Sequence, residues 1–261
     1  MAISVDTVYK TVLLILNKEQ RGYITPDEFN KTATQVQLDI FEQYFDDLNQ
    51  QLRVPQADYD YSDRQMNIDE KISFFKAIGS CTYNTSGGYW QLPTSAVGSS
   101  TFNIRYTIQP SLASGDAYFY RLGTITYTPL AGYPVELQRL QRNDFYNIDQ
   151  SPLTRPTKSF PCYLYEGNRL YVKPTDIQTG TGTIEASIIR KPLDVVWGFI
   201  PGGAGQYVWS PTTSRSFELE QSEQVNVILR ILQYSGIVIR DPQIIQAASA
   251  EVAQNEANKK S

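Results

Sequence analysis

The sequence contains no histidine, and this absence removes the side chain most often used for proton transfer. Histidine is also the usual central member of a catalytic triad and the commonest ligand of transition metals. The two cysteines, Cys81 and Cys162, are too few for a zinc site or a disulfide framework. We therefore expect a protein of a reducing compartment that is not an enzyme and has no catalytic residue, cofactor or metal.

Long apolar runs are missing as well. The longest one near the N-terminus covers residues 12–16, far too short to span a bilayer or to form the core of a signal peptide. The net charge of −4 at pH 7 argues against a protein that coats nucleic acid, whose surface needs clustered Lys and Arg. The sequence thus predicts no membrane partner and a protein made in a cytoplasm, unless an assembly carries it elsewhere.

What the chain does contain is typical of an ordered globular protein. Of its 261 residues, 41% are hydrophobic and 18 are tyrosines, which fits one large domain or two small ones. Charge is divided unevenly along the chain. Residues 1–80 carry 8 Lys and Arg against 13 Asp and Glu, whereas residues 121–195 carry 9 against 7. This division between an acidic first part and a mildly basic middle part bears on how copies pack against their neighbours.

The clearest element is a long helix over residues 25–52. Thr25 is a hydroxyl N-cap, Pro26 stands at the first helical position, and Glu28 is placed to complete a capping box. The apolar residues that follow are spaced by three and four, as on one buried helical face: Phe29, Ala33, Val36, Ile40, Phe41, Tyr44, Phe45, Leu48 and Leu52.

Two further helices are predicted in the first part of the chain. Ser4 is a suitable N-cap for a helix over residues 4–17. Gly22 marks the turn into the long helix, so these two helices should fold back as a helical hairpin. A third amphipathic helix is expected over residues 65–78, with Gly79 as its stop, and its inner face consists of Met66, Ile68, Ile72, Phe75 and Ile78.

Helical spacing resumes near the C-terminus. Residues 223–235 should form a short, strongly apolar helix that Ser222 caps and Gly236 ends. Asp241-Pro242 starts a last helix. Its apolar residues are Ile244, Ile245, Ala248 and Val252.

Between these helical parts the spacing becomes alternating, which is typical of strands. The clearest hairpin joins residues 162–165 to 170–172 through Gly167 and Asn168, both of which tolerate positive φ. Further strands are predicted at 101–108, 117–122 and 183–190. One helix is predicted at 134–146, and the proline-rich residues 151–161 should form a surface loop.

The order of elements is helices, strands, helices, without a repeat of solenoid or propeller length. The simplest topology folds both ends of the chain into one bundle. We therefore predict an α+β fold in which residues 1–79 and 216–261 form a helical bundle and residues 80–215 form an inserted antiparallel β-rich domain.

Two stretches imitate ligand-binding loops without their essential residues. The run from Asp58 to Asp69 has the carboxylate spacing of a calcium loop, but Asp63 stands where the sharp turn needs glycine and Asp69 replaces the usual Glu. A solvated acidic connection is the better interpretation. The glycine-rich residues 201–205 lack the following Lys-Ser or Lys-Thr of a phosphate-binding loop, so we expect a hairpin tip.

Three aromatic residues, Trp197, Tyr207 and Trp209, lie close together in sequence around that tip. Such a cluster can stack on a sugar ring, but these residue types more often belong to a core or to a protein interface. On its residues alone, the chain is a helical bundle with a β insertion and no active site.

Three stretches, taken in order, carry a resemblance to a known group of proteins. They are residues 17–30 (NKEQRGYITPDEFN) before the long helix, the hairpin at 161–174 entered from the proline-rich loop, and residues 232–248, where SGIVIRDP joins two short helices. Together they are similar to the head–tail connector, or ring, proteins of the crAss-like podophages. The match covers most of the chain and is weakest over residues 98–114 and 202–213.

The resemblance implies a virion structural protein that assembles in the host cytoplasm into a twelvefold ring at the head–tail junction. Its partners would be its own copies, the portal and neighbouring tail ring or hub proteins. Double-stranded DNA would be only transient cargo, and net acidity suits a channel that must not retain phosphates. The expected interface anchors, each of which can equally be core, are Tyr23, Tyr207, Trp209, Ile244, Ile245 and Val252.

Two other classes stay open beside this one. A virion surface module could bind host glycan through the aromatic β domain, with Trp197 and Trp209 as stacking residues, but it leaves the helical ends unexplained. A lytic or depolymerase enzyme would need an acid/base pair that the sequence does not offer. The connector is the interpretation that we rank first.

Overall fold

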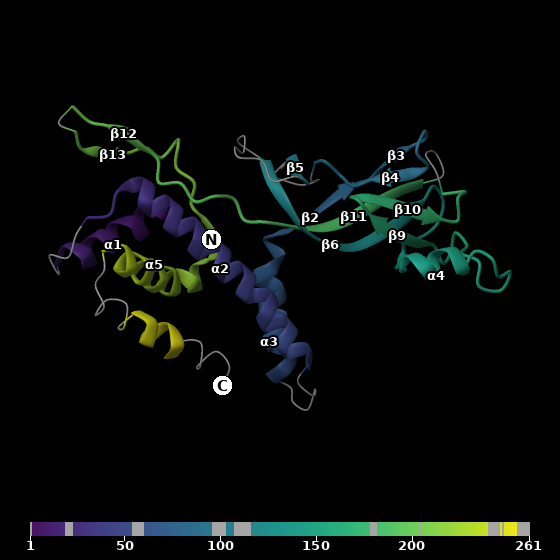
Figure 1. Ribbon diagram of the computed structural model, residues 1–261, viewed down its shortest axis with the longest axis horizontal. Helices are drawn as coiled ribbons and strands as arrows, with labels where there is room; N and C mark the ends of the chain where they lie inside the picture. The colour runs from purple at the N-terminus through teal and green to yellow at the C-terminus, as the bar shows by residue number, and fades with distance from the viewer. Residues whose placement is uncertain are drawn as a thin grey trace. The chain divides into compact units, whose positions relative to one another are not determined.

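The computed structural model describes residues 2–18, 23–53, 60–95, 103–106, 116–177, 182–203, 205–239, 246 and 248–254. It has an α+β fold, as the sequence predicts, and divides into two compact units (Figure 1). The helical unit comprises Met1–Phe74 and Pro192–Ser261, and the β unit comprises Phe75–Lys191. None of the described helices is long and apolar enough to cross a membrane.

Four helices dominate the helical unit, and α2 is the longest of them. The helix α5 packs against α1 and α2, and α3 packs against α2. Residues 248–254 are helical as well. The bounds of the four helices are Val5–Lys18 for α1, Pro26–Arg53 for α2, Asp60–Ser73 for α3 and Gln224–Ile239 for α5.

The capping box at the start of α2 forms as predicted. The backbone N–H of Thr25 donates to Glu28 Oε2 at 2.9 Å, and the backbone N–H of Glu28 donates to Thr25 Oγ1 at 3.4 Å. The predicted inner face is confirmed over its described length, because its members from Phe29 to Phe45 are buried, and α2 packs against α5 and α3. Other buried residues of the helical unit are Val8, Val12 and Leu16 of α1 and Val227 and Ile231 of α5.

A short sheet closes the helical unit. The strand β1 (Ala2–Ile3) pairs antiparallel with β14 (Phe217–Glu220), so the start of the chain lies beside the segment that leads into α5. Ile3 and Phe217 are both fully buried there. This pairing brings the two ends of the sequence into one core.

The third predicted helix is displaced in the structure. It begins at Asp60 and ends at Ser73, and the next residues form β2 (Lys76–Ser80) instead of a further helical turn. Phe75 is buried as expected, but Ile78 lies in the strand with 52% of its side chain exposed. The prediction was wrong here because β2 pairs with a distant strand, and such pairing outweighs local helix propensity.

The helix α5 also differs from its prediction at both ends. It runs through the buried Gly236 to Ile239, so this glycine does not end the helix. A glycine inside a helix costs only about 1 kcal/mol, and here the apolar pattern continues beyond it. Ser222 is not a cap, because it lies within a short 3-10 turn, Gln221–Glu223.

The β unit consists of two packed sheets. One has the order β2–β11–β6–β5, with β7 beside β6, and the other has the order β3–β4–β10–β9–β8. Most pairs are antiparallel, but β5 pairs parallel with β6 and β8 pairs parallel with β9. The bounds are β3 Thr82–Asn84, β4 Tyr89–Gln91, β5 Asn103–Arg105, β6 Asp116–Pro129, β7 Val135–Glu136, β8 Gln138–Arg139, β9 Cys162–Glu166, β10 Arg169–Lys173 and β11 Gly182–Arg190.

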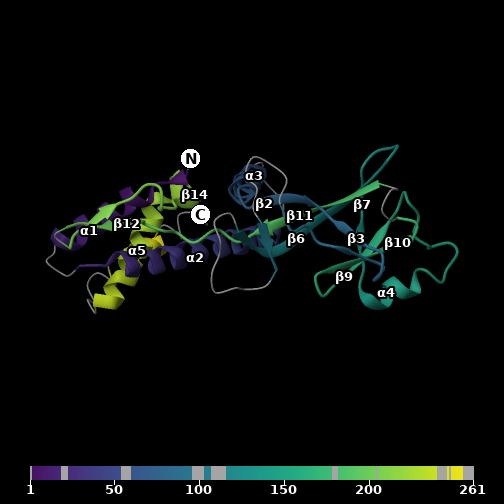
Figure 2. The ribbon, with the colours of Figure 1, turned by 90° about the horizontal axis from the view of Figure 1, so that it is seen from above.

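The core of the β unit lies between the two sheets. Burial alternates along β11, so that Ile184, Ala186 and Ile188 point inward while Glu185 does not. They meet Trp90, Tyr163, Leu170 and Val172 from the other sheet in one apolar cluster. The short helix α4 (Arg142–Asn147) lies beside β9 (Figure 2). Its Phe145 packs on Cys162 and Leu164.

Two predictions about the β unit can be compared directly with the structure. The hairpin β9–β10 is confirmed, with Gly167 at φ 59° and Asn168 at φ 61° in its turn. The helix predicted at 134–146 is wrong in its first half, where β7 and β8 form instead, because Val135 pairs with Tyr127 and Gln138 pairs with Cys162.

The boundary after the β unit also lies elsewhere than the sequence suggests. The sequence assigns residues up to 215 to the β-rich domain, whereas Pro192–Ser261 belong to the helical unit in the structure. A small hairpin, β12 (Phe199–Pro201) with β13 (Tyr207–Trp209), lies within this reassigned segment. The contacts of this segment with α2 are the physical reason why the boundary lies at residue 192 and not at 215.

Candidate interaction surface

A row of polar side chains on α2 holds the segment that leads to the hairpin. Asn30 binds the backbone of Trp197 twice: Trp197 N–H donates to Asn30 Oδ1 at 2.7 Å, and Asn30 Nδ2 donates to Trp197 O at 3.4 Å. One turn later, Thr34 Oγ1 accepts from Val195 N–H at 3.1 Å and donates to Val195 O at 3.4 Å. The helix thus pairs with an extended chain in the manner of a neighbouring strand.

Gln37 completes this row at the next turn and is 1% exposed. Its Nε2 donates to Leu193 O at 2.7 Å, and its Oε1 accepts from Glu218 N–H at 2.8 Å. Since buried backbone groups need partners, these bonds satisfy the segment on both sides of the hairpin. We call Asn30, Thr34 and Gln37 the polar row of α2.

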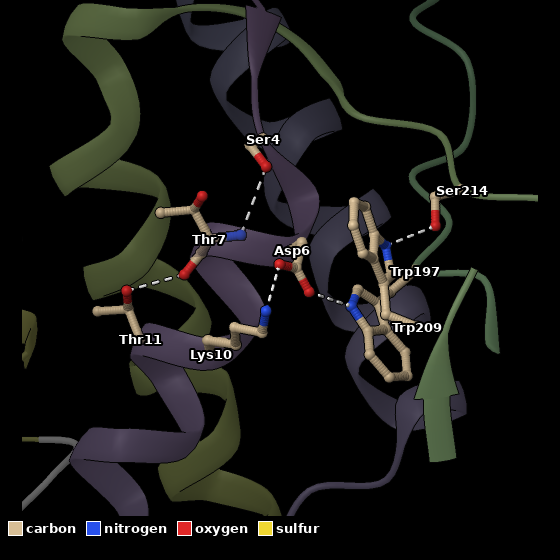
Figure 3. Close-up of polar contacts among 8 residues, drawn as sticks. All are labelled: Ser4, Asp6, Thr7, Lys10, Thr11, Trp197, Trp209 and Ser214. Carbon is tan, nitrogen blue, oxygen red and sulfur yellow. Dashed lines mark hydrogen bonds and ion pairs between the residues drawn. The ribbon is translucent and has the colours of Figure 1, made fainter. Parts of the chain in front are cut away.

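Trp197 is the anchor of the segment. Its ring is buried at 4% exposure and lies 4.4 Å from the Tyr9 ring, centroid to centroid. Its indole N–H donates to Asp6 Oδ1 at 3.2 Å, and Asp6 Oδ2 accepts from Lys10 Nζ at 2.7 Å, as Figure 3 shows. The polar atom of the buried indole therefore has a partner on α1.

A column of aromatic rings continues from this anchor to the surface. Phe29 lies 4.8 Å from Tyr9, Trp197 lies 6.2 Å from Phe199, and Phe199 lies 4.8 Å from Tyr207. The column begins at Phe29, which is fully buried, and ends at Tyr207, which is 45% exposed. Contacts between aromatic rings each contribute about 0.5–1.5 kcal/mol beyond area burial, so the column fixes the hairpin on the core.

Tyr23 lies beside Tyr9, a buried member of this aromatic column. The Tyr9 hydroxyl donates to Ile24 O at 3.3 Å. Burial raises the pKa of Tyr9, and a hydrogen bond with the Tyr23 side chain and electrostatic interaction with Tyr23 and Tyr207 raise it further. Tyr23 is 55% exposed. Two residues expected from the sequence as interface anchors, Tyr23 and Tyr207, therefore lie around the same buried tyrosine.

The hairpin presents apolar residues on both of its faces. Phe199 pairs with Trp209 across the ribbon, and Ile200 pairs with Val208. Because successive side chains point to opposite faces of a strand, Ile200 and Val208 lie on the face away from the aromatic column. Their exposed fractions are 58% and 48%. This is the outer face of the hairpin.

Trp209, the third expected anchor, is held in place although it is 39% exposed. Its indole N–H donates to Ser214 Oγ at 2.9 Å (Figure 3), and Lys10 Nζ lies 5.9 Å from the ring centroid. The tip beyond it is a glycine turn, in which Gly202 N–H donates to Gln206 O at 2.8 Å. The hairpin tip predicted at residues 201–205 is thus present, apart from Ala204, which is outside the described residues.

The remaining expected anchors are Ile244, Ile245 and Val252. Ile244 and Ile245 lie outside the described residues, and Val252 is half-buried in the helical residues 248–254. Trp197 belongs to the core, the interpretation preferred from the sequence, so its ring offers no platform for a sugar. Sequence reasoning missed the polar row of α2, although polar residues at positions 30, 34 and 37 beside an apolar face were a usable signal.

The two cysteine thiols are poorly reactive. Burial raises the pKa of the Cys81 thiol to about 12 and that of Cys162 to about 11, so both are protonated at neutral pH and are poor nucleophiles. Within the described part of the chain, no cluster of three or more Cys, Asp or Glu could hold a metal ion. Asp60, Asp63 and Asp69 of the calcium-like stretch belong to helix α3 and not to a loop.

Comparison with known proteins adds no family to these observations. The chain matches no protein-family model and no curated protein sequence. The surface formed by Tyr23, Ile200, Tyr207, Val208 and Trp209 therefore has to be interpreted from its own geometry. Its residues are largely apolar, and the indole N–H of Trp209, its one tryptophan, is already bonded to Ser214, which suits contact with another protein surface.

Proposed function

We propose that this protein is a structural component of a tailed phage virion that forms a twelvefold ring at the head–tail junction. It bridges the portal to the tail around the channel through which DNA and ejected proteins pass. The support is twofold: the resemblance of residues 17–30, 161–174 and 232–248 to ring proteins, and the exposed hairpin surface. The observation that carries the proposal is that the aromatic column and the polar row of α2 hold this exposed hairpin in place.

A rigid apolar projection suits permanent assembly for an energetic reason. Ordering a mobile loop on binding costs about 0.5–1.5 kcal/mol per rotamer-rich side chain, and this hairpin is already ordered. Burying a side chain such as Ile200 or Val208 contributes roughly 1.5–3 kcal/mol relative to leaving it exposed. Aromatic residues such as Tyr207 and Trp209 are also the types that dominate protein interfaces.

The partners in this proposal are other copies of the chain, the portal and the neighbouring tail ring or hub proteins. The protein assembles in the host cytoplasm and ends in the virion. DNA is a transient cargo of the channel, and the net charge of −4 fits a lumen that does not retain phosphate groups.

A second candidate function rests on Trp209, whose ring is partly exposed beside Tyr207. Such a pair could stack on a host glycan in a virion surface module. This alternative predicts binding to capsular sugar that Trp209→Ala abolishes. It has less support because Trp197, the other expected stacking residue, is buried.

The test is negative-stain electron microscopy of the purified protein, alone and mixed with the portal of the same phage. We expect a closed ring or a new tier on the portal. Ile200→Ser with Val208→Ser removes the outer face of the hairpin without touching the aromatic column, and should weaken docking. Leu130→Ser, which changes an 81% exposed residue of the β unit, is the control. A persistent monomer that ignores the portal would overturn the proposal.

A further inference from the structure

The two units of the chain carry opposite net charge. Counted over their sequence ranges, the helical unit has 12 Lys and Arg against 20 Asp and Glu, a net charge of −8. The β unit has 11 Lys and Arg against 7 Asp and Glu, a net charge of +4. Opposite charge favours contact between the helical unit of one copy and the β unit of another, and disfavours contact between like units.

The β unit has one loop that combines positive charge with exposed apolar side chains. Residues 151–161, which we call the basic loop, contain Arg155 and Lys158 and no acidic residue. Leu153 is 97% exposed and Phe160 is 81% exposed. Large apolar residues beside cations on one loop are typical of a surface that becomes buried in an assembly.

The basic loop is held in shape by its own bonds. Arg155 N–H donates to Ser151 O at 3.0 Å, and Phe160 N–H donates to Thr157 O at 3.0 Å. Three of its residues are prolines, which fix the backbone φ, and the middle one, Pro156, is buried. The exposure of Leu153 and Phe160 therefore belongs to an ordered loop.

The helical unit has a surface with the complementary pattern. Met66 is 67% exposed on α3, and Phe74, directly after the helix, is 53% exposed. The exposed residues Asp69 and Glu70 lie between them. Spacings of three and four residues place Met66, Asp69 and Glu70 on one side of the helix, and Phe74 follows in the turn directly after it. We call this set the α3 face.

We infer that the basic loop of one copy docks on the α3 face of a neighbouring copy, an inference that rests on the proposed ring function. Leu153 and Phe160 would bury against Met66 and Phe74, while Arg155 and Lys158 would meet Asp69 and Glu70. Both surfaces have two apolar residues that flank two charges, and the charges are of opposite sign.

Such a contact joins two different patches, so it repeats from copy to copy in one direction. A heterologous contact of this kind generates a closed ring when the rotation closes, whereas a self-complementary patch would stop at a dimer. The inference thus supplies a contact that fits the proposed ring.

Charge reversal in two separate variants tests the inference. The loop variant carries Arg155→Glu and Lys158→Glu, and the helix variant carries Asp69→Lys and Glu70→Lys. Within each variant the two docking surfaces have the same sign of charge, so each alone should need an about tenfold higher concentration to assemble, equivalent to 1.4 kcal/mol. In an equimolar mixture every contact between unlike chains is again of opposite charge, and assembly should return.

The readout is electron microscopy with and without portal, together with analytical ultracentrifugation. Arg155 Nε lies 3.6 Å from Asp149 Oδ1, and reversal of Arg155 leaves Asp149 with a second partner, because Lys173 Nζ lies 2.8 Å from its Oδ2. Circular dichroism verifies that each variant folds. The variant Lys31→Glu with Arg121→Glu is the control, because it makes the same change in net charge as the loop variant on exposed residues elsewhere.

Each outcome decides something different. Assembly of the mixture but not of either variant supports the docking of the basic loop on the α3 face. The inference is overturned if either variant alone assembles as well as the wild-type protein, or if the mixture stays unassembled. In both cases the proposed function still stands as long as the wild-type protein forms rings. A wild-type protein that stays monomeric in both conditions overturns both.

Discussion

At the scale of single residues, the start of α2 shows how a local interaction becomes pH-dependent. Glu28 Oε2 accepts hydrogen bonds from the Thr25 backbone N–H at 2.9 Å and from the Thr25 hydroxyl at 2.7 Å. Both bonds favour the ionised carboxylate, so they lower the pKa of Glu28. A carboxylate whose pKa is lowered by folding stabilises the folded protein only while it is ionised.

The first prediction concerns this carboxylate. The contribution of ionised Glu28 to the stability of the folded protein is complete at neutral pH. This contribution is lost as the pH falls from the ordinary carboxyl pKa of ~4 through the lowered pKa of the folded state. Glu28→Gln should therefore lower the free energy of unfolding by about 0.5–1 kcal/mol at pH 7 and by less at pH 3. Urea denaturation at both pH values measures the difference.

Glu42→Gln is the matched control, because Glu42 is exposed on the same helix but far from its N-terminus. An equal loss of stability at pH 7 and pH 3 in Glu28→Gln would show that the charge of Glu28 plays no part.

At the scale of elements, side chains of α2 hold the segment that runs from Pro192, where the helical unit resumes, to the start of α5. An extended segment beside a helix leaves its backbone N–H and C=O groups without ladder partners, and the polar row of α2 supplies them. The hairpin β12–β13 depends on this support, because an isolated two-stranded ribbon is at best marginally stable in water.

The second prediction therefore concerns Gln37. Gln37→Leu keeps the size of the side chain but leaves Leu193 O and Glu218 N–H without their partner. An unsatisfied buried polar group costs about 1–3 kcal/mol, so the free energy of unfolding should fall by at least about 2 kcal/mol. Urea denaturation measures the loss, and hydrogen exchange should show faster exchange of the Glu218 amide.

Gln35→Leu serves as its control, since Gln35 is exposed on the same helix, where its Nε2 donates to Asp39 Oδ1 at 2.9 Å. Similar stability of the two variants would mean that the polar row does not hold the segment.

At the scale of the whole molecule, the β unit is a continuous piece of chain with adjoining ends. Arg190 N–H donates to Phe75 O at 3.0 Å, which brings its first and last residues together. Its core between the two sheets comes from its own residues. A unit with a closed core and neighbouring ends has the properties of an inserted domain.

The third prediction follows from these ends. A fragment of residues 75–191 should fold alone and unfold cooperatively, as measured by circular dichroism and by the dispersion of its amide NMR signals. A fragment of residues 80–215 should fold less well, because it lacks most of β2 and carries residues 192–215 without α2. Equal behaviour of both fragments would contradict the boundary in the structure.

The elements that could be predicted from the sequence are those whose causes are local. The cap at Thr25, the apolar spacing of α2 and the Gly167-Asn168 turn each involve residues within a few positions of one another. Hydrogen bonding, helical periodicity and backbone sterics act over that range, so these features followed from the sequence without knowledge of the rest of the fold.

What only the tertiary structure decided depends on partners far apart in the chain. Ile78 became part of a strand because β11 pairs with β2, and residues 192–198 left the β unit because Asn30, 167 residues from Trp197, binds their backbone. The Trp197 ring is buried against Tyr9, whereas Tyr207 and Trp209 remain partly exposed. The sequence alone determined the α+β class and the aromatic candidates, but packing over long separations decided which of them reach the surface.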